Sequence, residues 1–273
     1  MDRRERKAYE VELRHRINAG RVAVLEQTGF FKRQFGDVSS EWKADDTRVT
    51  FADFAISEKM FRELGSQFSK DDFCSEEGSP SDEILQLDAP FAWVVDPIDG
   101  TNNYALGNRN CAIALGLLYE GTPVYGFVYD HSRECLWEGG PGFGLNCDRT
   151  RVNREKATLD AQPMVGLHFP MPDKLLAQLG PLMSQYRVRS FGSAALSTAY
   201  LASGYFFGVV DQKVKVWDVA ASYALCRAVD IDWRFIERPL FPLTHFHVDM
   251  EACPFVAGTE AFMDQFAAIG DIV

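Results

Sequence analysis

The chain has 273 residues, 47% of them hydrophobic, which is enough to bury a full core. Its formal net charge is −11 at pH 7 and its pI is near 5.0, which argues against nonspecific binding to nucleic acid or to an anionic membrane. No apolar run reaches the roughly 18 residues of a membrane span, and the charged N-terminus lacks the apolar stretch of a signal peptide. The six cysteines form no Cys-x-x-Cys pair, so reduced thiols and a cytoplasmic location are expected.

The first half of the chain, residues 1–150, is predicted to be an α+β unit. Apolar residues at helical spacing predict two helices, and apolar runs between turn residues predict several strands. Glu120-Gly121 is expected to join two of these strands as a hairpin, and a turn is expected over 139–142. In chain order, the expected elements are helices over 3–29 and 52–64 and strands over 91–95, 110–119, 123–129 and 134–138.

The second half, residues 151–273, is predicted to be an α/β unit because strands and helices alternate along it. Ser193 precedes one of the helical segments and is expected to cap it. The expected strands cover 163–169, 187–191 and 206–210, and the expected helices cover 173–184, 193–202 and 216–228.

Two carboxylates follow the apolar run that ends at Val95, and they form the most informative feature of the sequence. Asp96 and Asp99 are three residues apart, with Pro97 between them to stiffen the turn. Two acids at a rigid strand end can share hard cations, and magnesium bound by carboxylates and a substrate phosphate is the expected use. Gly100 then allows close approach of the backbone to a ligand, so the N–H group of Gly100 and that of Thr101 can face that phosphate.

This segment resembles the first signature of the inositol monophosphatase family, D-P-[IL]-D-G-T-x-N-[FY]. Other landmarks of the family occur in the same order between about residues 43 and 222. The matching segments are Lys43, Val49-Thr50-Phe51-Ala52-Asp53, Ser75-Glu76-Glu77-Gly78, Asp96-Pro97-Ile98-Asp99-Gly100-Thr101-Asn102-Asn103-Tyr104, Phe191-Gly192-Ser193-Ala194-Ala195 and Trp217-Asp218-Val219-Ala220-Ala221. The resemblance implies a layered αβαβα sandwich of the inositol monophosphatase and fructose-1,6-bisphosphatase type.

The resemblance implies a magnesium site with two or three ions. Glu76, Asp96 and the backbone carbonyl of Ile98 would bind the first ion. Asp99 and Asp218 would join Asp96 at the second ion. From the residues alone, Glu76 fits a solvated acidic loop, and Asp218 fits an acid that complements the N-terminus of a helix.

The resemblance also implies a hydrolysis without a phosphoenzyme, in which water activated by metal attacks the phosphate. Asp53 and Thr101 would orient that water, with Glu76 as a further catalytic residue through its metal. The backbone N–H groups of Gly100 and Thr101 would complete the phosphate pocket. The alternative interpretation is structural, because Asp53 and Thr101 are each also placed to cap a helix.

The substrate pocket is less well defined by the sequence. By resemblance, Asp211 occupies the position of an acid that holds sugar hydroxyls, and Ser193 and Ala194 line the same pocket. Asp99 and Asp218 would also contact the substrate. Lys213 and Lys215 depart from the pattern typical of inositol-specific enzymes, which indicates either a solvated loop or a substrate with a second anionic group.

The resemblance implies a phosphomonoesterase whose substrate is a small phosphorylated alcohol, with inositol monophosphate as the leading candidate. Histidinol phosphate is the first alternative, and nucleotide 3′-phosphates and sugar bisphosphates are others. Another possibility is a regulator that binds a partner and retains the phosphatase fold. A homodimer is expected, whereas nucleic acid and membrane partners are not.

Overall fold

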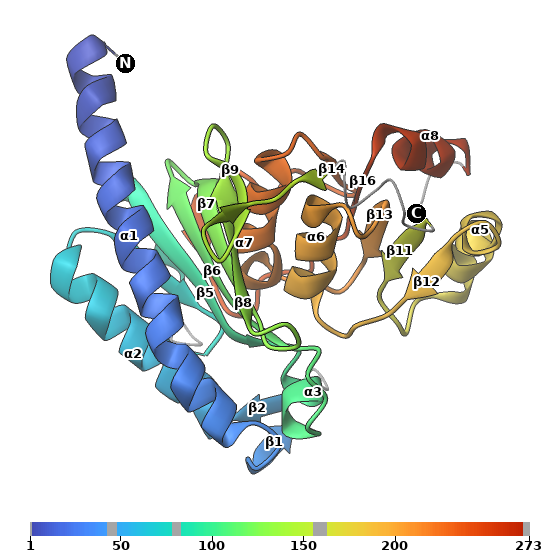
Figure 1. Cartoon of the computed structure of the whole chain (residues 1–273), viewed down its shortest axis with the longest axis horizontal. Helices are drawn as coiled ribbons and strands as arrows, with labels where there is room; N and C mark the ends of the chain where they lie inside the picture. The colour runs from blue at the N-terminus through green and yellow to red at the C-terminus, as the bar shows by residue number, and fades with distance from the viewer. Residues whose placement is uncertain (1, 43–47, 78–82, 155–162, 270–273) are drawn as a thin grey trace.

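The computed structural model describes residues 2–42, 48–77, 83–154 and 163–269. Five layers follow one another across the molecule: two helices, a large sheet, two helices, a small sheet and two helices (Figure 1). The αβαβα sandwich expected from the sequence is thereby confirmed. Lys43 and Gly78, two of the family landmarks, lie outside the described residues.

The first layer consists of α1 (Arg3–Gln34) and α2 (Phe51–Gln67), which run beside each other over one face of the large sheet (Figure 1). Their apolar sides enclose Trp93 and Phe127 of that sheet, both fully buried. Both helices extend beyond their predicted ends. Leu25 and Phe54, apolar residues of these helices, are 43% and 48% exposed.

The large sheet has seven strands in the order β10-β9-β8-β7-β6-β5-β3. Neighbouring strands are antiparallel except β3 and β5, which are parallel. Glu120 and Gly121 both have positive φ and form the predicted hairpin. The strands are β3 (Asp72–Ser75), β5 (Phe91–Asp99), β6 (Ala112–Tyr119), β7 (Thr122–Asp130), β8 (Cys135–Gly140), β9 (Gly144–Cys147) and β10 (Thr150–Arg151).

Helices α6 (Ala194–Ser203) and α7 (Val216–Arg227) form the middle layer between the two sheets (Figure 1). Ser193 caps α6 as predicted, because its Oγ accepts a hydrogen bond from the N–H of Leu196. Helix α7 lies very close to the large sheet, since a Cβ at Gly126 of β7 would be only 2.0 Å from the carbonyl oxygen of Ala221. Small residues on both surfaces therefore set the position of α7.

The small sheet has five strands in the order β12-β11-β13-β16-β14, and α5 and α8 cover its outer face (Figure 1). The first three strands are parallel, and β16 is antiparallel to both of its neighbours. The elements are β11 (Met164–Leu167), α5 (Asp173–Met183), β12 (Arg187–Arg189), β13 (Gly208–Asp211), β14 (Asp232–Phe235), β16 (Phe255–Gly258) and α8 (Glu260–Ala268).

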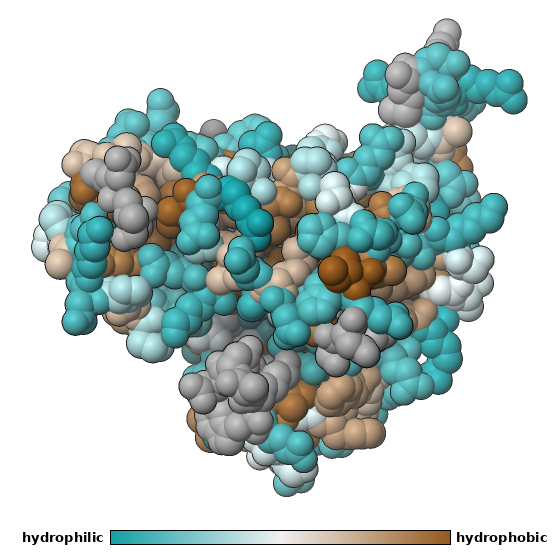
Figure 2. All heavy atoms as spheres, turned by 180° about the vertical axis from the view of Figure 1, so that it is seen from behind, coloured by the Kyte–Doolittle hydropathy of each residue, from teal (hydrophilic) through white to brown (hydrophobic). Residues whose placement is uncertain are grey.

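Short elements complete the described fold: β1 (Ser40–Trp42) pairs with β2 (Arg48–Thr50), β4 (Leu85–Gln86) pairs with β15 (His245–Phe246), and α3 (Thr101–Ala105) follows β5. The turn predicted at 139–142 begins later, because Gly139 and Gly140 belong to β8. No helix of the described ranges is long and apolar enough to cross a membrane. On the far face, apolar surface residues form small groups among hydrophilic ones (Figure 2).

Candidate active site

Three carboxylates meet where β5 ends beside the first turn of α7. One oxygen from each of Asp96, Asp99 and Asp218 lies within 4.8 Å of the others. A regular strand would turn residues three apart to opposite faces, but β5 has a bulge between Asp96 and Asp99. These two residues pair with Ala114 and Ala112, which pack toward the middle helices. The bulge therefore turns both carboxylates toward α7.

Glu76 belongs to the same edge of the sheet. Strands β3 and β5 are parallel, and Ser75 pairs with Val95, so Glu76 follows its strand beside Asp96. The N–H of Glu76 donates to the carbonyl oxygen of Val95 at 3.4 Å. The parallel pairing of β3 with β5, the bulge in β5 and the start of α7 thus bring together the four carboxylates that were predicted to act together.

The charges of this group repel one another. Burial, followed by the charges of Glu76, Asp99 and Asp218, holds the pKa of the Asp96 carboxyl well above its usual range. Burial also raises the pKa of Asp218 strongly and that of Asp99 to about 6. Within the described residues, no Lys or Arg forms a salt bridge with these three acids. An all-oxygen cluster with uncompensated negative charge fits hard divalent cations such as magnesium.

Asp53 lies at the start of α2, where its side chain can both cap the helix and face Thr101. Its Oδ2 accepts hydrogen bonds from the N–H and Oγ1 of Thr50, at 2.7 and 2.6 Å, in a capping box. Its Oδ1 lies 3.5 Å from the Oγ1 of Thr101, a long contact, while that hydroxyl donates to the carbonyl oxygen of Ile98 at 2.9 Å. Burial, opposed by the bonds from Thr50, raises the pKa of Asp53 to about 7. A buried carboxylate of this kind can accept a proton near neutral pH.

Gly100 connects β5 to α3 with φ of 85°, in the left-handed region. A Cβ at this position would lie 2.9 Å from the carbonyl oxygen of Gly192 and 3.0 Å from that of Asn110. Glycine is therefore required both by conformation and by the close approach of the segment before α6. The N–H groups of Gly100 and Thr101 begin the short helix α3 beside the carboxylates.

The N-terminus of α6 holds the Asp99 side chain. The N–H groups of Ala194 and Ala195 donate to its two oxygens at 3.2 and 2.8 Å, and the hydroxyl of Ser193 donates to Oδ2. Ser193 and Ala194 were predicted to line the substrate pocket, and the structure places them against this carboxylate. The second half of the chain is thus attached directly to the strand end of the first half.

Asp211 ends β13 and is 4% exposed. Its Oδ2 lies 3.4 Å from the Nδ1 of His168, and its Oδ1 accepts a hydrogen bond from the N–H of Lys213 at 3.1 Å. Sequence reasoning gave His168 no role, because it lies inside the strand predicted over 163–169, whereas Asp211 directly follows the strand predicted over 206–210. Of the two lysines, Lys213 is exposed, whereas the Nζ of Lys215 donates to the carbonyl oxygen of Met250. Lys215 is therefore committed to a structural contact.

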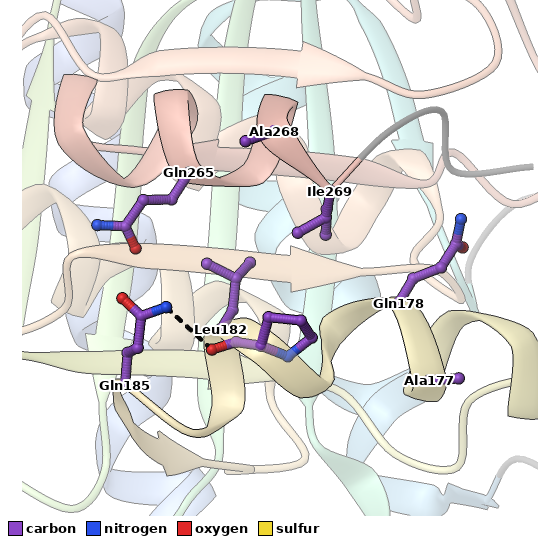
Figure 3. Close-up of a pocket in the computed structure, with 8 residues that line it drawn as sticks. Ala177, Gln178, Leu182, Gln185, Gln265, Ala268 and Ile269 are labelled. Carbon is purple, nitrogen blue, oxygen red and sulfur yellow. Dashed lines mark hydrogen bonds between the residues drawn. The ribbon is translucent and has the colours of Figure 1, made fainter.

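Two other features do not belong to this site. Cys135, Cys147 and Asp148 form a second group of ligand-type atoms within 4.8 Å of one another, on strands at the other side of the large sheet. All six cysteines are free thiols, as predicted. A pocket between α5 and α8 is lined by aliphatic, proline and amide side chains without an ionisable group (Figure 3). Neither feature offers the carboxylate chemistry of the β5 edge.

Solved structures share this fold. The extragenic suppressor protein suhB from Bartonella henselae matches with a TM-score of 0.78 and 22% identity, covering 92% of this chain and 96% of that chain. An inositol monophosphatase and NADP phosphatase complexed with Mg²⁺ and phosphate matches with a TM-score of 0.73 and 21% identity, covering 90% and 91%. The fold is therefore that of the inositol monophosphatase and fructose-1,6-bisphosphatase class.

Sequence comparison defines the family within this class. The inositol monophosphatase family model matches residues 10–231. The inositol-1-monophosphatase of Rhizobium meliloti is 32% identical over 222 residues, which cover 77% of this chain and 82% of the relative. The chain belongs to the inositol monophosphatase family and is a phosphatase.

Proposed function

We propose that this phosphatase hydrolyses a phosphomonoester of a small polyhydroxylated alcohol, with inositol monophosphate as the leading candidate. The observation that carries the proposal is the cluster of the buried Asp96 and Asp99 with the half-buried Asp218, because divalent cations would neutralise its combined negative charge. Two or three magnesium ions would be held by five residues, namely Glu76, Asp96, Asp99 and Asp218 through carboxylates and Ile98 through its carbonyl oxygen. Most of these ligands lie in residues 1–150, and residues 151–273 complete the site.

When bound, magnesium supplies Lewis-acid chemistry, which makes water more acidic and neutralises charge on phosphoryl oxygens. Asp53 and Thr101 orient the attacking water, and Asp53 accepts its proton, for which a pKa of about 7 is suitable. The N–H groups of Gly100 and Thr101 hold phosphate oxygens at the start of α3. The buried position of Asp53 and the position of Thr101 at the start of α3 support this division of roles.

Asp211 supports a hydroxyl-bearing substrate, since a buried carboxylate at a strand end accepts hydrogen bonds from hydroxyl groups. Histidinol phosphate, a nucleotide 3′-phosphate and a sugar bisphosphate would use the same metal ligands and are the competing substrates. A regulator that binds a partner without turnover is a different kind of function. The complete carboxylate set supports catalysis over that role. A cytoplasmic homodimer is part of the proposal.

The test is phosphate release from inositol 1-phosphate, histidinol phosphate, adenosine 3′,5′-bisphosphate and fructose 1,6-bisphosphate, with and without magnesium. Asp96→Asn should abolish the magnesium-dependent turnover, because it removes a charge shared by the metal sites. Asp264→Asn is the matched control, since Asp264 is an exposed acid on α8 and should leave turnover unchanged. Absence of turnover with all four substrates, in protein that binds magnesium, would contradict the proposal and favour the regulator.

A further inference from the structure

Cys135 on β8 and Cys147 on β9 lie side by side, toward the β10 edge of the large sheet. Cys147 pairs with Trp137, and Cys135 precedes Trp137 by two residues, so both thiols project from the same face of the sheet. Their sulfur atoms and a carboxylate oxygen of Asp148 lie within 4.8 Å of one another. In a tetrahedral zinc site with Zn–S bonds of about 2.3 Å, two sulfurs are about 3.8 Å apart. Small side-chain rotations are therefore enough to close these three atoms around one ion.

Backbone hydrogen bonds hold Asp148 beside the thiols. The N–H of Asp148 donates to the carbonyl oxygen of Leu136 at 3.0 Å, and its Oδ1 accepts from the N–H of Leu136 at 2.9 Å. Leu136 adjoins Cys135 and Asp148 adjoins Cys147, so this reciprocal pair of bonds fixes the acid relative to both thiols. Over the described ranges, Oδ2 of Asp148 accepts no hydrogen bond. The carboxylate therefore keeps one oxygen for a ligand.

The three side chains form a gradient from the core to the solvent. Cys135 is 7% exposed and belongs, with Trp137, to the core cluster beneath the middle helices. The Trp137 ring meets Tyr200 of α6 edge-on, which closes this side to water. Cys147 is half-buried and Asp148 is exposed. An ion can thus enter from the solvent side and still be bordered by an apolar shell, which strengthens metal binding.

The charges at this place favour a cation. Of the charged side chains that most affect the thiols, Asp130 and Asp148 are acids and Arg133 is a cation. Two negative charges against one positive charge make the place negative before either thiol ionises. The largest effect on each thiol comes from the other, which raises the pKa of Cys135 and lowers that of Cys147. One thiolate therefore forms ahead of the other, and the thiolate is the form that binds metals.

This place is separate from the carboxylate cluster of the β5 edge. A row of paired residues crosses four neighbouring strands from Asp99 through Ala112 and Asp130 to Cys135. Three interstrand spacings of about 4.8 Å put Cys135 roughly 14 Å from Asp99. The ligand types differ as well, because carboxylates select hard cations such as magnesium whereas thiolates select soft ones. The two places therefore suit different ions.

We propose that Cys135, Cys147 and Asp148 form a second metal site, for Zn²⁺ or another thiophilic divalent cation, with its fourth position open to solvent. Binding releases the thiol protons and forms two metal–sulfur bonds and one metal–oxygen bond, and no electron is transferred. Since the ligands lie on β8, on β9 and in the turn before β10, the bound ion ties these segments together and stabilises the folded chain. The inference does not depend on the phosphatase reaction.

Cobalt tests this site, because charge transfer from thiolate to Co²⁺ gives a near-ultraviolet absorption that carboxylate ligands do not produce. In reduced protein with excess magnesium, the absorption should grow up to one equivalent of Co²⁺ per chain, and Zn²⁺ should abolish it by displacement. Cys147→Ser should lose the absorption, and Asp148→Asn should shift its midpoint to higher Co²⁺ concentration. Cys226→Ser is the matched control and should keep it, because the buried Sγ of Cys226 only donates to the carbonyl oxygen of Thr198, as a hydroxyl also can.

Thermal unfolding gives a second readout. With excess magnesium, Zn²⁺ should raise the Tm of the unaltered protein and leave that of Cys147→Ser unchanged. Absence of thiolate absorption in the reduced, unaltered protein would overturn the inference, and so would equal absorption in Cys147→Ser. If Cys147→Ser does not fold, Asp148→Asn decides, and a cobalt titration unchanged by that substitution would reject the site. A disulfide between Cys135 and Cys147 in air, in protein whose reduced form binds no cobalt, would reject it as well.

Discussion

Gly126 on β7 is the position where a single methyl group should damage both the fold and the proposed metal site. A Cβ there would lie 2.0 Å from the Ala221 carbonyl oxygen of α7, and separations below 3.0 Å are essentially never found for real Cβ atoms. Gly126→Ala therefore requires α7 to move outward by about 1 Å, and overpacking of this kind costs about 1–3 kcal/mol of unfolding free energy. Asp218 lies one turn before Ala221 on the same helix and must move with it.

Two measurements follow for Gly126→Ala. Urea unfolding of the magnesium-free protein should give a midpoint lowered by the equivalent of about 1–3 kcal/mol. Turnover should need more magnesium and reach a lower maximum, since a displacement of about 1 Å at a catalytic group can reduce the rate by about a hundredfold. The control is Gly180→Ala on α5, where no atom lies within 4 Å of the added Cβ. That variant should be as stable as the original or slightly more stable.

The identity of the clashing atom distinguishes Gly126 from another close contact of the same helix. At Gly126 the obstacle is a backbone carbonyl, so Ala221→Gly should not rescue Gly126→Ala. At Gly116 of β6 the nearest atom is the Cβ of Ala220 at 2.9 Å, so Ala220→Gly should partly rescue Gly116→Ala. A stable Gly126→Ala protein with an unchanged magnesium requirement would show that α7 does not depend on this contact.

Three further predictions concern stability and reactivity. Asp71→Ala should lower the unfolding free energy by about 3–5 kcal/mol in urea titrations, because the buried Arg16 guanidinium loses its buried carboxylate partner. Arg16 donates two hydrogen bonds to Asp71, at 2.8 and 2.7 Å. A change below about 1 kcal/mol would contradict this prediction. In protein treated with chelator, the unfolding free energy should fall as pH rises from about 4 to about 7, because the folded-state pKa is about 7 for Asp53 and about 6 for Asp99, both above the unfolded value of 3.8. Asp53 alone accounts for about 4 kcal/mol of this fall. Adding magnesium should remove the trend. Iodoacetamide should alkylate Cys147 first, as mass spectrometry would show, because this thiol is partly exposed and a hydrogen bond from a neighbouring thiol lowers its pKa; uniform labelling of all six cysteines would contradict this.

Several elements were predictable because their signals are local. Helical spacing predicted α1 and α2, and Glu120-Gly121 predicted the hairpin between β6 and β7. Their ends were less predictable, because a helix continues past its last clear apolar repeat only where tertiary packing supports it; α1 accordingly runs to Gln34 and not to the predicted end at residue 29. The exposure of Leu25 and Phe54 could not be predicted from the sequence either, because an apolar residue at the margin of the apolar face of a helix is buried only if another element covers it.

The sequence by itself determined the family and the identity of the carboxylates, because both depend on short segments in a set order. Tertiary structure alone decided how those carboxylates face one another. The bulge in β5, the parallel pairing of β3 and the close packing of α7 arise from long-range contacts that no local pattern encodes. His168 shows the same limit, because only the pairing of two parallel strands places it beside Asp211, which lies 43 residues later in the chain.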